Sequence, residues 1–139
     1  MTNAQLKDIR ESAKEVLRTG IELRRPFVNA QRMCIYFSAH TPDGSEMLYV
    51  EGTLDGMPHA WNTLDGKIVD LGVNRTHVVS EKDCARYEPF GSYTWMDCIT
   101  NSQRMGGKWW WMCTDWMSAD WRRRAQELEI ESLRETRKF

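Results

Sequence analysis

The chain has 139 residues, and its 19 Lys and Arg against 20 Asp and Glu give a formal net charge of −1 at pH 7. This balance argues against a nucleic-acid-binding protein that depends on overall positive charge. With 41% hydrophobic and 28% charged residues, the composition predicts a single globular domain over residues 1–139 and excludes a wholly disordered chain.

Cysteine usage and hydropathy predict a cytoplasmic protein. No apolar run approaches the roughly 18 residues that a membrane-spanning helix needs, and the charged N-terminus lacks the apolar region of a secretory signal. Four cysteines without close pairing predict reduced thiols rather than a disulfide framework. We therefore expect no membrane partner.

Residues 3–19 are predicted to form an amphipathic helix. Its apolar positions recur at three-to-four spacing, with charged residues between them, as is typical of a helix that packs one face on a core. These positions are Leu6, Ile9, Ala13, Val16 and Leu17. Thr2 or Asn3 can cap the start of this helix, and Gly20 suits its end.

Pro26 interrupts the chain after this helix, and residues 24–33 are predicted to be extended or irregular. Residues 34–40 form a short apolar segment. Such a segment fits either one or two turns of a buried helix or a buried strand. The sequence Thr-Pro-Asp-Gly at 41–44 is a strong turn signal that ends this piece.

The middle of the chain predicts an antiparallel sheet. Residues 46–54, 59–64 and 67–71 are rich in strand-forming residues, and residues 75–80 are a candidate fourth strand. Asp65-Gly66 is the dipeptide that two-residue type I′ hairpins prefer, because both central residues need positive φ.

The second half has a weaker pattern. We predict irregular structure over residues 81–108, with at most a short strand or helix near 92–98. Residues 109–113 fit a buried strand or the lead-in to a helix, and residues 118–138 are predicted to form a long C-terminal helix. The fold class is therefore α+β: an N-terminal helix, a small antiparallel sheet of three to five strands, and a long C-terminal helix.

The predicted hairpin makes a geometric prediction about chemistry. With Asp65 and Gly66 as turn residues, Trp61 lies opposite Asp70. Because side chains alternate along strands, His59, Trp61 and Asp70 share one face. His59 and Asp70 are then diagonal neighbours, within reach of a hydrogen bond.

An imidazole paired with a carboxylate is what a thiol nucleophile needs. A neighbouring His lowers the pKa of the thiol, and the carboxylate fixes the tautomer of the ring. Cys34 is the candidate nucleophile because it precedes the sheet that carries His59. Its own backbone N–H is one candidate oxyanion donor, and Gln31 or Asn29 is a candidate second donor.

Four segments resemble small papain-like or transglutaminase-like cysteine proteins, many of them from bacteria and bacteriophages. The segments are Cys34-Ile-Tyr, Tyr49-Val-Glu-Gly, Pro58-His59-Ala-Trp61-Asn62 and Asp65-Gly66-Lys-Ile-Val-Asp70. The resemblance covers less than a third of the chain. It implies a papain/transglutaminase-like core with Cys34 as nucleophile, His59 as general base and acid, and Asp70 as the orienting group.

The resemblance is incomplete in two places. The turn at Thr41-Pro42 cuts short the helix that such proteins have after the nucleophile. The Trp-rich second half matches no motif.

Structural roles are the alternative for the same residues. His59 beside Trp61 fits a buried structural pair, and Asp70 fits a turn cap. Cys84, Cys98 and Cys113 with His77 are conceivable zinc ligands, but the chain has no C-x-x-C pair, so buried thiols are preferred and we expect no metal or other cofactor.

Two functions are therefore open. The first is a cysteine-dependent hydrolase or acyl transferase that acts on an amide-type bond of a protein or peptide through Cys34, His59 and Asp70. The second is a non-enzymatic binding or inhibitor protein of bacteriophage type, which acts on a host protein. Its surface would be rich in Trp, with Trp61, Trp109, Trp110 and Trp111 as candidates.

Overall fold

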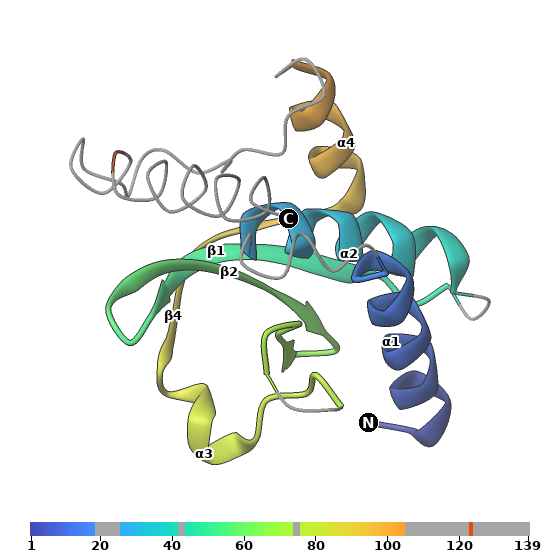
Figure 1. The fold of residues 1–139 in the computed structure, drawn as a ribbon, viewed down its shortest axis with the longest axis horizontal. Helices are drawn as coiled ribbons and strands as arrows, with labels where there is room; N and C mark the ends of the chain where they lie inside the picture. Colours follow the sequence, from blue (N-terminus) through green and yellow to red (C-terminus); the bar gives the residue numbers. More distant parts are fainter. Residues whose placement is uncertain (19–25, 42–43, 74–75, 105–122, 124–139) are drawn as a thin grey trace, which may run out of the picture.

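The computed structural model describes residues 1–18, 26–41, 44–73, 76–104 and 123 (Figure 1). Within them the elements are, in chain order, α1 (Asn3–Val16), α2 (Pro26–His40), β1 (Met47–Leu54), β2 (Met57–Leu64), β3 (Lys67–Val69), α3 (Glu81–Cys84), β4 (Tyr87–Tyr93) and α4 (Trp95–Arg104). None of the helices in these residues is long and apolar enough to cross a membrane.

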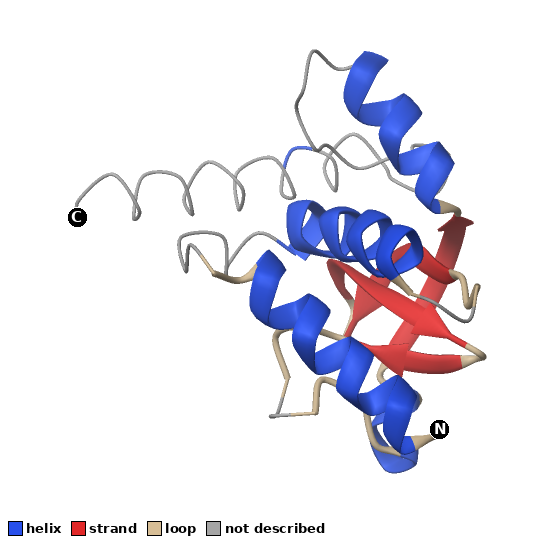
Figure 2. Ribbon diagram, turned by 90° about the vertical axis from the view of Figure 1, so that its right-hand side faces the viewer, coloured by secondary structure: helices blue, strands red, loops and turns tan. Residues whose placement is uncertain are grey.

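The four strands form one antiparallel sheet in the order β3-β2-β1-β4. Helices α1 and α2 pack together on one face of this sheet, and α4 packs on α2 and β1 (Figure 2). The opposite face is covered by the segment that leads through α3 to β4. The predicted α+β class and the small antiparallel sheet are thereby confirmed.

The predicted N-terminal helix is confirmed as α1, which ends at Val16 rather than at residue 19. Thr2 caps it through a capping box: the Thr2 hydroxyl accepts from the Gln5 N–H, and the Gln5 side chain accepts from the Thr2 N–H. Ile9, Ala13 and Val16 are buried against α2 and the sheet, as the apolar spacing requires.

The prediction for residues 24–33 was wrong at Pro26, where helix α2 begins. Proline suits the first position of a helix, because its missing N–H has no intrahelical partner there and its φ is already helical. The helix then continues without interruption to His40. It buries Phe27, Ala30 and Cys34 against β1 and β2.

Both hairpins turn at an Asp-Gly dipeptide, and the hairpin predicted at Asp65-Gly66 is confirmed. Asp55 and Gly56 have φ of 53° and 80°, and Asp65 and Gly66 have 50° and 77°, as type I′ turns require. The register of the second hairpin pairs Leu64 with Lys67 and Asn62 with Val69, which is the predicted pairing.

The prediction of irregular structure was wrong over residues 81–104, apart from the short strand or helix expected near 92–98; residues 105–108 lie outside the described residues. Three elements lie in residues 81–104, α3, β4 and α4, and β4 pairs with β1 at the edge of the sheet. Strand β4 forms because it pairs with β1, which is distant in sequence, so local hydrophobic periodicity gave no sign of it. The candidate strand at 75–80 is reduced to a single bridge between Val69 and Val78. The predicted elements at 109–113 and 118–138 lie outside the described residues.

Candidate functional site

His59 and Asp70 form a hydrogen-bonded pair at the β2–β3 hairpin. His59 lies in β2, and Asp70 directly follows β3. His59 Nε2 is 2.8 Å from Asp70 Oδ2, so the predicted diagonal contact is confirmed. The side chain of His59 is 19% exposed and that of Asp70 only 6%. The pair therefore combines a buried carboxylate with an imidazole that solvent can reach.

The Asp70 carboxylate accepts three hydrogen bonds. Besides His59, the hydroxyl of Tyr87 donates to Oδ2 at 2.8 Å, and the N–H of Gly72 donates to Oδ1 at 3.0 Å. Burial raises the pKa of Asp70. The hydrogen bond and charge of His59, with the Gly72 and Tyr87 donors, lower the pKa by more than burial raises it, so the pKa lies below its usual value. Asp70 is therefore ionised at neutral pH.

This ionised carboxylate determines the tautomer of His59. An ionised carboxylate can only accept hydrogen bonds. Nε2 of His59 therefore carries a proton, and this N–H donates a hydrogen bond to Asp70. In the neutral ring, Nδ1 then bears a lone pair. Nδ1 has no hydrogen-bond partner within the part of the chain that the structure describes. His59 is thus oriented as a proton acceptor.

Aromatic rings surround the pair on this face of the sheet. Trp61 and Tyr87 meet edge to face with centroids 5.1 Å apart, and the His59 ring lies 6.2 Å from Trp61 and 6.3 Å from Tyr87. Trp61 is only 2% exposed. Its prediction as a partner-facing residue was wrong, because it packs in the core cluster beneath this face, whereas its predicted place beside His59 is confirmed.

Cys34 lies on the other face of the sheet. It packs with Tyr49 and Ala60 in the core under α2, and its thiol donates to the Met47 carbonyl oxygen at 3.1 Å. Because Ala60 and His59 are consecutive residues of one strand, they point to opposite faces. The sheet therefore separates Cys34 from the His59–Asp70 pair. Cys34 is also fully buried, so it is not placed to act as the nucleophile of that pair.

The two candidate oxyanion donors lie on α2, with Cys34, and not beside His59. Gln31 is fully buried, and its amide donates to the Tyr49 hydroxyl at 3.4 Å; Asn29 is 4% exposed. The Tyr49 hydroxyl donates in turn to the buried carboxylate of Glu51. Burial and this carboxylate raise the pKa of Tyr49. Gln31 therefore belongs to a structural polar network between α2 and β1.

The remaining cysteines do not assemble a metal site. In the residues that the structure describes, no group of three His, Cys, Asp or Glu side chains could hold a metal ion. Cys98 lies beside Cys34 in the core under α2, where a hydrogen bond with Cys34 and burial raise its pKa. Cys84 packs instead at the edge of the Trp61–Tyr87 cluster, and its thiol donates to the Ser80 carbonyl oxygen. Cys113 and Trp109, Trp110 and Trp111 lie outside the described residues.

Three residues of this site escaped the sequence analysis. Tyr87 carries no local signal, because β4 brings it to Asp70 from 17 residues away. Gly72 follows Asp70 by two positions, the spacing of an Asx-turn, which was a usable signal. Gly52 lies opposite His59, and a Cβ there would fall 2.0 Å from the Glu88 carbonyl oxygen. An isolated Gly in a strand is a known sign of such close approach.

No protein-family model, no curated protein and no solved structure matches this chain.

Proposed function

We propose that this protein is a hydrolase or acyl transferase that acts on an amide-type bond of a protein or peptide, with His59 as general base and acid. The observation that carries the proposal is the 2.8 Å hydrogen bond between His59 Nε2 and the buried, ionised Asp70. A base oriented in this way, with its second nitrogen directed away from the carboxylate, is the arrangement that proton abstraction needs.

The nucleophile in this proposal is water, or an acceptor amine, rather than the thiol of Cys34. His59 Nδ1 takes a proton from the attacking water as its oxygen bonds to the amide carbon. The tetrahedral intermediate then collapses, the C–N bond breaks, and the imidazolium gives its proton to the leaving amine. Asp70 stabilises the imidazolium between these steps without taking up the proton itself.

The order of the elements supports a papain- or transglutaminase-like core as part of this proposal. A helix, α2, is followed by antiparallel strands, with His59 on the second strand and Asp70 after the third. This order is the one that the resemblance implies. The departure lies at Cys34, which stands well inside α2 rather than at its start and faces the core under α2.

The test compares single variants in hydrolysis of a panel of peptide p-nitroanilides and of p-nitrophenyl acetate. We expect His59→Ala to lower the rate above buffer by about 10²–10⁴-fold, the usual contribution of a general base. Cys34→Ser is the matched control, because a serine hydroxyl can keep the hydrogen bond to the Met47 carbonyl, and it should retain activity. No hydrolysis above buffer by the folded wild type, or loss of activity in Cys34→Ser alone, would refute the proposal.

A second candidate function is binding to a host protein, and exposed apolar side chains on and beside the edge strand favour it. Phe90 lies in β4 at a shift in register against β1, and it is 45% exposed. Met96, at the start of α4, is 52% exposed. If this surface binds a protein, Phe90→Ser should abolish the capture of one defined partner while His59→Ala leaves it intact; capture that survives Phe90→Ser counts against this role.

A further inference from the structure

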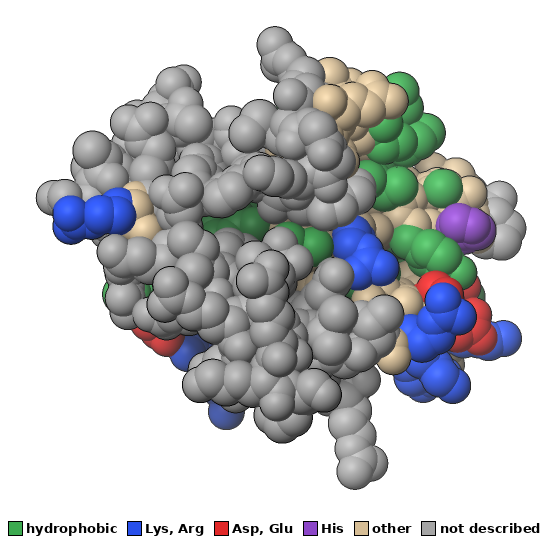
Figure 3. Space-filling model, turned by 45° about the horizontal axis from the view of Figure 1, so that its top comes forward, with side chains coloured by type: hydrophobic (Ala, Val, Ile, Leu, Met, Phe, Trp, Pro, Cys, Tyr) green, Lys and Arg blue, Asp and Glu red, His purple; other side chains and the backbone are tan. Residues whose placement is uncertain are grey.

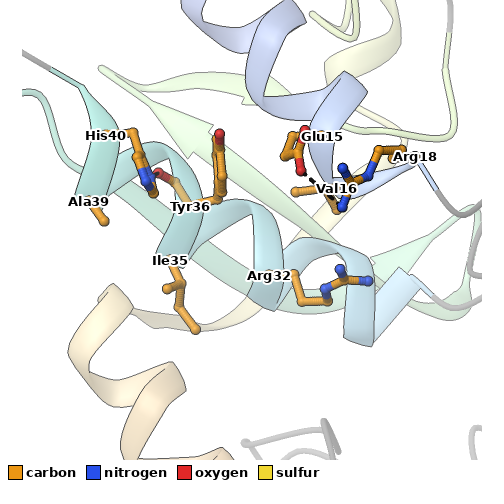
Figure 4. Close-up of a pocket in the computed structure, with 8 residues that line it drawn as sticks. All are labelled: Glu15, Val16, Arg18, Arg32, Ile35, Tyr36, Ala39 and His40. Atoms are coloured by element: carbon orange, nitrogen blue, oxygen red, sulfur yellow. Dashed lines mark hydrogen bonds and ion pairs between the residues drawn. The ribbon is translucent and has the colours of Figure 1, made fainter.

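The His59–Asp70 pair lies on the face of the sheet that α1 and α2 do not cover. A cavity of about 310 Å³, which Val16 and Tyr36 help to line, lies between these two helices and is separated from the pair by the sheet (Figure 4). Figure 3 shows hydrophobic side chains next to Lys or Arg side chains on the upper face of the molecule. The side chains that contact the pair come instead from its own face of the sheet.

Tyr87 reaches Asp70 from the opposite edge of the sheet. It begins β4, which pairs with β1, and it is 7% exposed. Its hydroxyl lies 2.8 Å from Asp70 Oδ2, the same oxygen that accepts from His59 Nε2 at 2.8 Å. Its ring also meets the Trp61 ring edge to face. Packing of the ring therefore holds the hydroxyl at the carboxylate.

Tyr87 remains a hydrogen-bond donor at neutral pH. Burial and the negative charge of Asp70 raise the pKa of Tyr87, so its hydroxyl keeps its proton. A hydroxyl that donates to an ionised carboxylate makes a charge-assisted hydrogen bond, which is stronger than one between neutral groups. Two donors thus meet at Asp70 Oδ2, the N–H of His59 and the O–H of Tyr87.

The Asp70 carboxylate needs such donors because it is buried. Burial by itself raises the pKa of Asp70 and favours the protonated form. A protonated Asp70 would no longer stabilise an imidazolium, and it would no longer require Nε2 of His59 to be the donor. Hydrogen bonds to the carboxylate favour the ionised form, and the Tyr87 hydroxyl supplies one of them from a part of the chain outside the hairpin.

We propose that Tyr87 is a positioning residue for His59, which keeps the Asp70 carboxylate in place and ionised while His59 holds the proton taken from the attacking water. Because its hydroxyl is buried and directed at Asp70, Tyr87 acts through the carboxylate and not on the substrate. The role in catalysis rests on the proposed function. The effect of Tyr87 on Asp70 does not, and it is measurable without a substrate.

The test compares Tyr87→Phe with Tyr93→Phe in the full chain. Both variants remove one hydroxyl from β4, but the Tyr93 ring packs beside Tyr49 in the core under α2, so Tyr93→Phe is the matched control. NMR titration of the ¹³C-labelled Asp70 carboxyl gives its midpoint in each protein. We expect Tyr87→Phe to raise this midpoint by about one pH unit, as the loss of one hydrogen bond to a charged group predicts, and Tyr93→Phe to leave it unchanged.

Kinetics on the p-nitroanilide that the wild type cleaves fastest test the catalytic role. We expect Tyr87→Phe to lower kcat and kcat/KM together by about tenfold with KM unchanged, because the lost interaction matters when His59 is charged and not when substrate binds. A purely structural role for Tyr87 would lower the stability without moving the Asp70 midpoint.

A second substitution keeps the test independent of the folding of Tyr87→Phe. Tyr87→3-fluorotyrosine retains the ring and makes the hydroxyl a stronger donor, so the Asp70 midpoint should fall below that of the wild type. Equal midpoints in Tyr87→Phe and Tyr93→Phe, no fall with 3-fluorotyrosine, or a loss of activity through KM alone would each overturn the proposal. A wild type that hydrolyses nothing above buffer refutes the proposed function instead, and the two midpoint comparisons then decide whether Tyr87 keeps Asp70 ionised.

Discussion

Gly52 is the position where a single methyl group should damage the site most. In Gly52→Ala the new Cβ would stand 2.0 Å from the Glu88 carbonyl oxygen and 2.9 Å from the Trp61 ring. Real Cβ contacts are essentially never closer than 3.0 Å, so β4 would have to move away from β1 by about 1 Å at this point. The obstacle is backbone, which cannot rotate out of the way as a flexible side chain can.

The cost follows from what this movement breaks. Overpacking in a well-packed interior typically costs about 1–3 kcal/mol, and the shift also weakens pairing of β4 with β1 where β4 brings Tyr87 to Asp70. We expect a loss of about 3 kcal/mol in the free energy of unfolding and a Tm lower by about 10 °C. Urea denaturation and calorimetry measure these two quantities.

Gly72→Ala is the control for the loss of glycine itself. Its Cβ would meet only Asp70 Oδ1, at 3.5 Å, which is ordinary van der Waals contact, so its stability should remain close to that of the wild type. Should Gly52→Ala unfold at the same urea concentration as Gly72→Ala, the close approach of β4 to β1 at Gly52 would not exist in solution.

Two further variants test the site and the first helix. Because the pKa of Asp70 is lowered on folding, its carboxylate contributes stability above a pH of about 4 and loses that contribution as the pH falls further. The stability lost in Asp70→Asn should therefore be large near pH 6 and shrink toward pH 2 in urea titrations, and a pH-independent difference would contradict the lowered pKa. Thr2→Ala removes the hydroxyl that accepts from the Gln5 N–H and should cost about 1 kcal/mol, measured by the same titration. Thr2→Ser keeps that hydroxyl as its control, and equal losses in the two variants would exclude the cap.

The hairpin and the contact between His59 and Asp70 could be predicted because they depend on neighbours in sequence. An Asp-Gly dipeptide sets the turn type, the turn sets the register, and the register with strand alternation places His59 and Asp70 on one face. The first helix was predictable for the same reason, from its apolar spacing and its Thr2 cap. These features need no knowledge of the rest of the fold.

The place of Cys34 was decided only by the tertiary structure. Whether a residue of α2 meets His59 depends on which face of the sheet the helix covers, and no local pattern states this. The start of the helix at Pro26 leaves Cys34 in its interior, where packing against Tyr49 and Ala60 turns the thiol into the core. Cys34, His59 and Asp70 thus follow one another in the expected order along the chain, but the sheet separates Cys34 from His59 and Asp70.

The contact between Tyr87 and Asp70 was likewise decided only by the tertiary structure. Tyr87 completes the hydrogen bonds of Asp70, yet it reaches that carboxylate only because β4 pairs with β1 at the far edge of the sheet, next to Gly52. Sequence alone determined the contact between His59 and Asp70, since a tight turn joins the strands that carry them. The long-range strand pairing and the face chosen by α2 decided which other groups join them, because both result from burial of apolar surface across the whole domain.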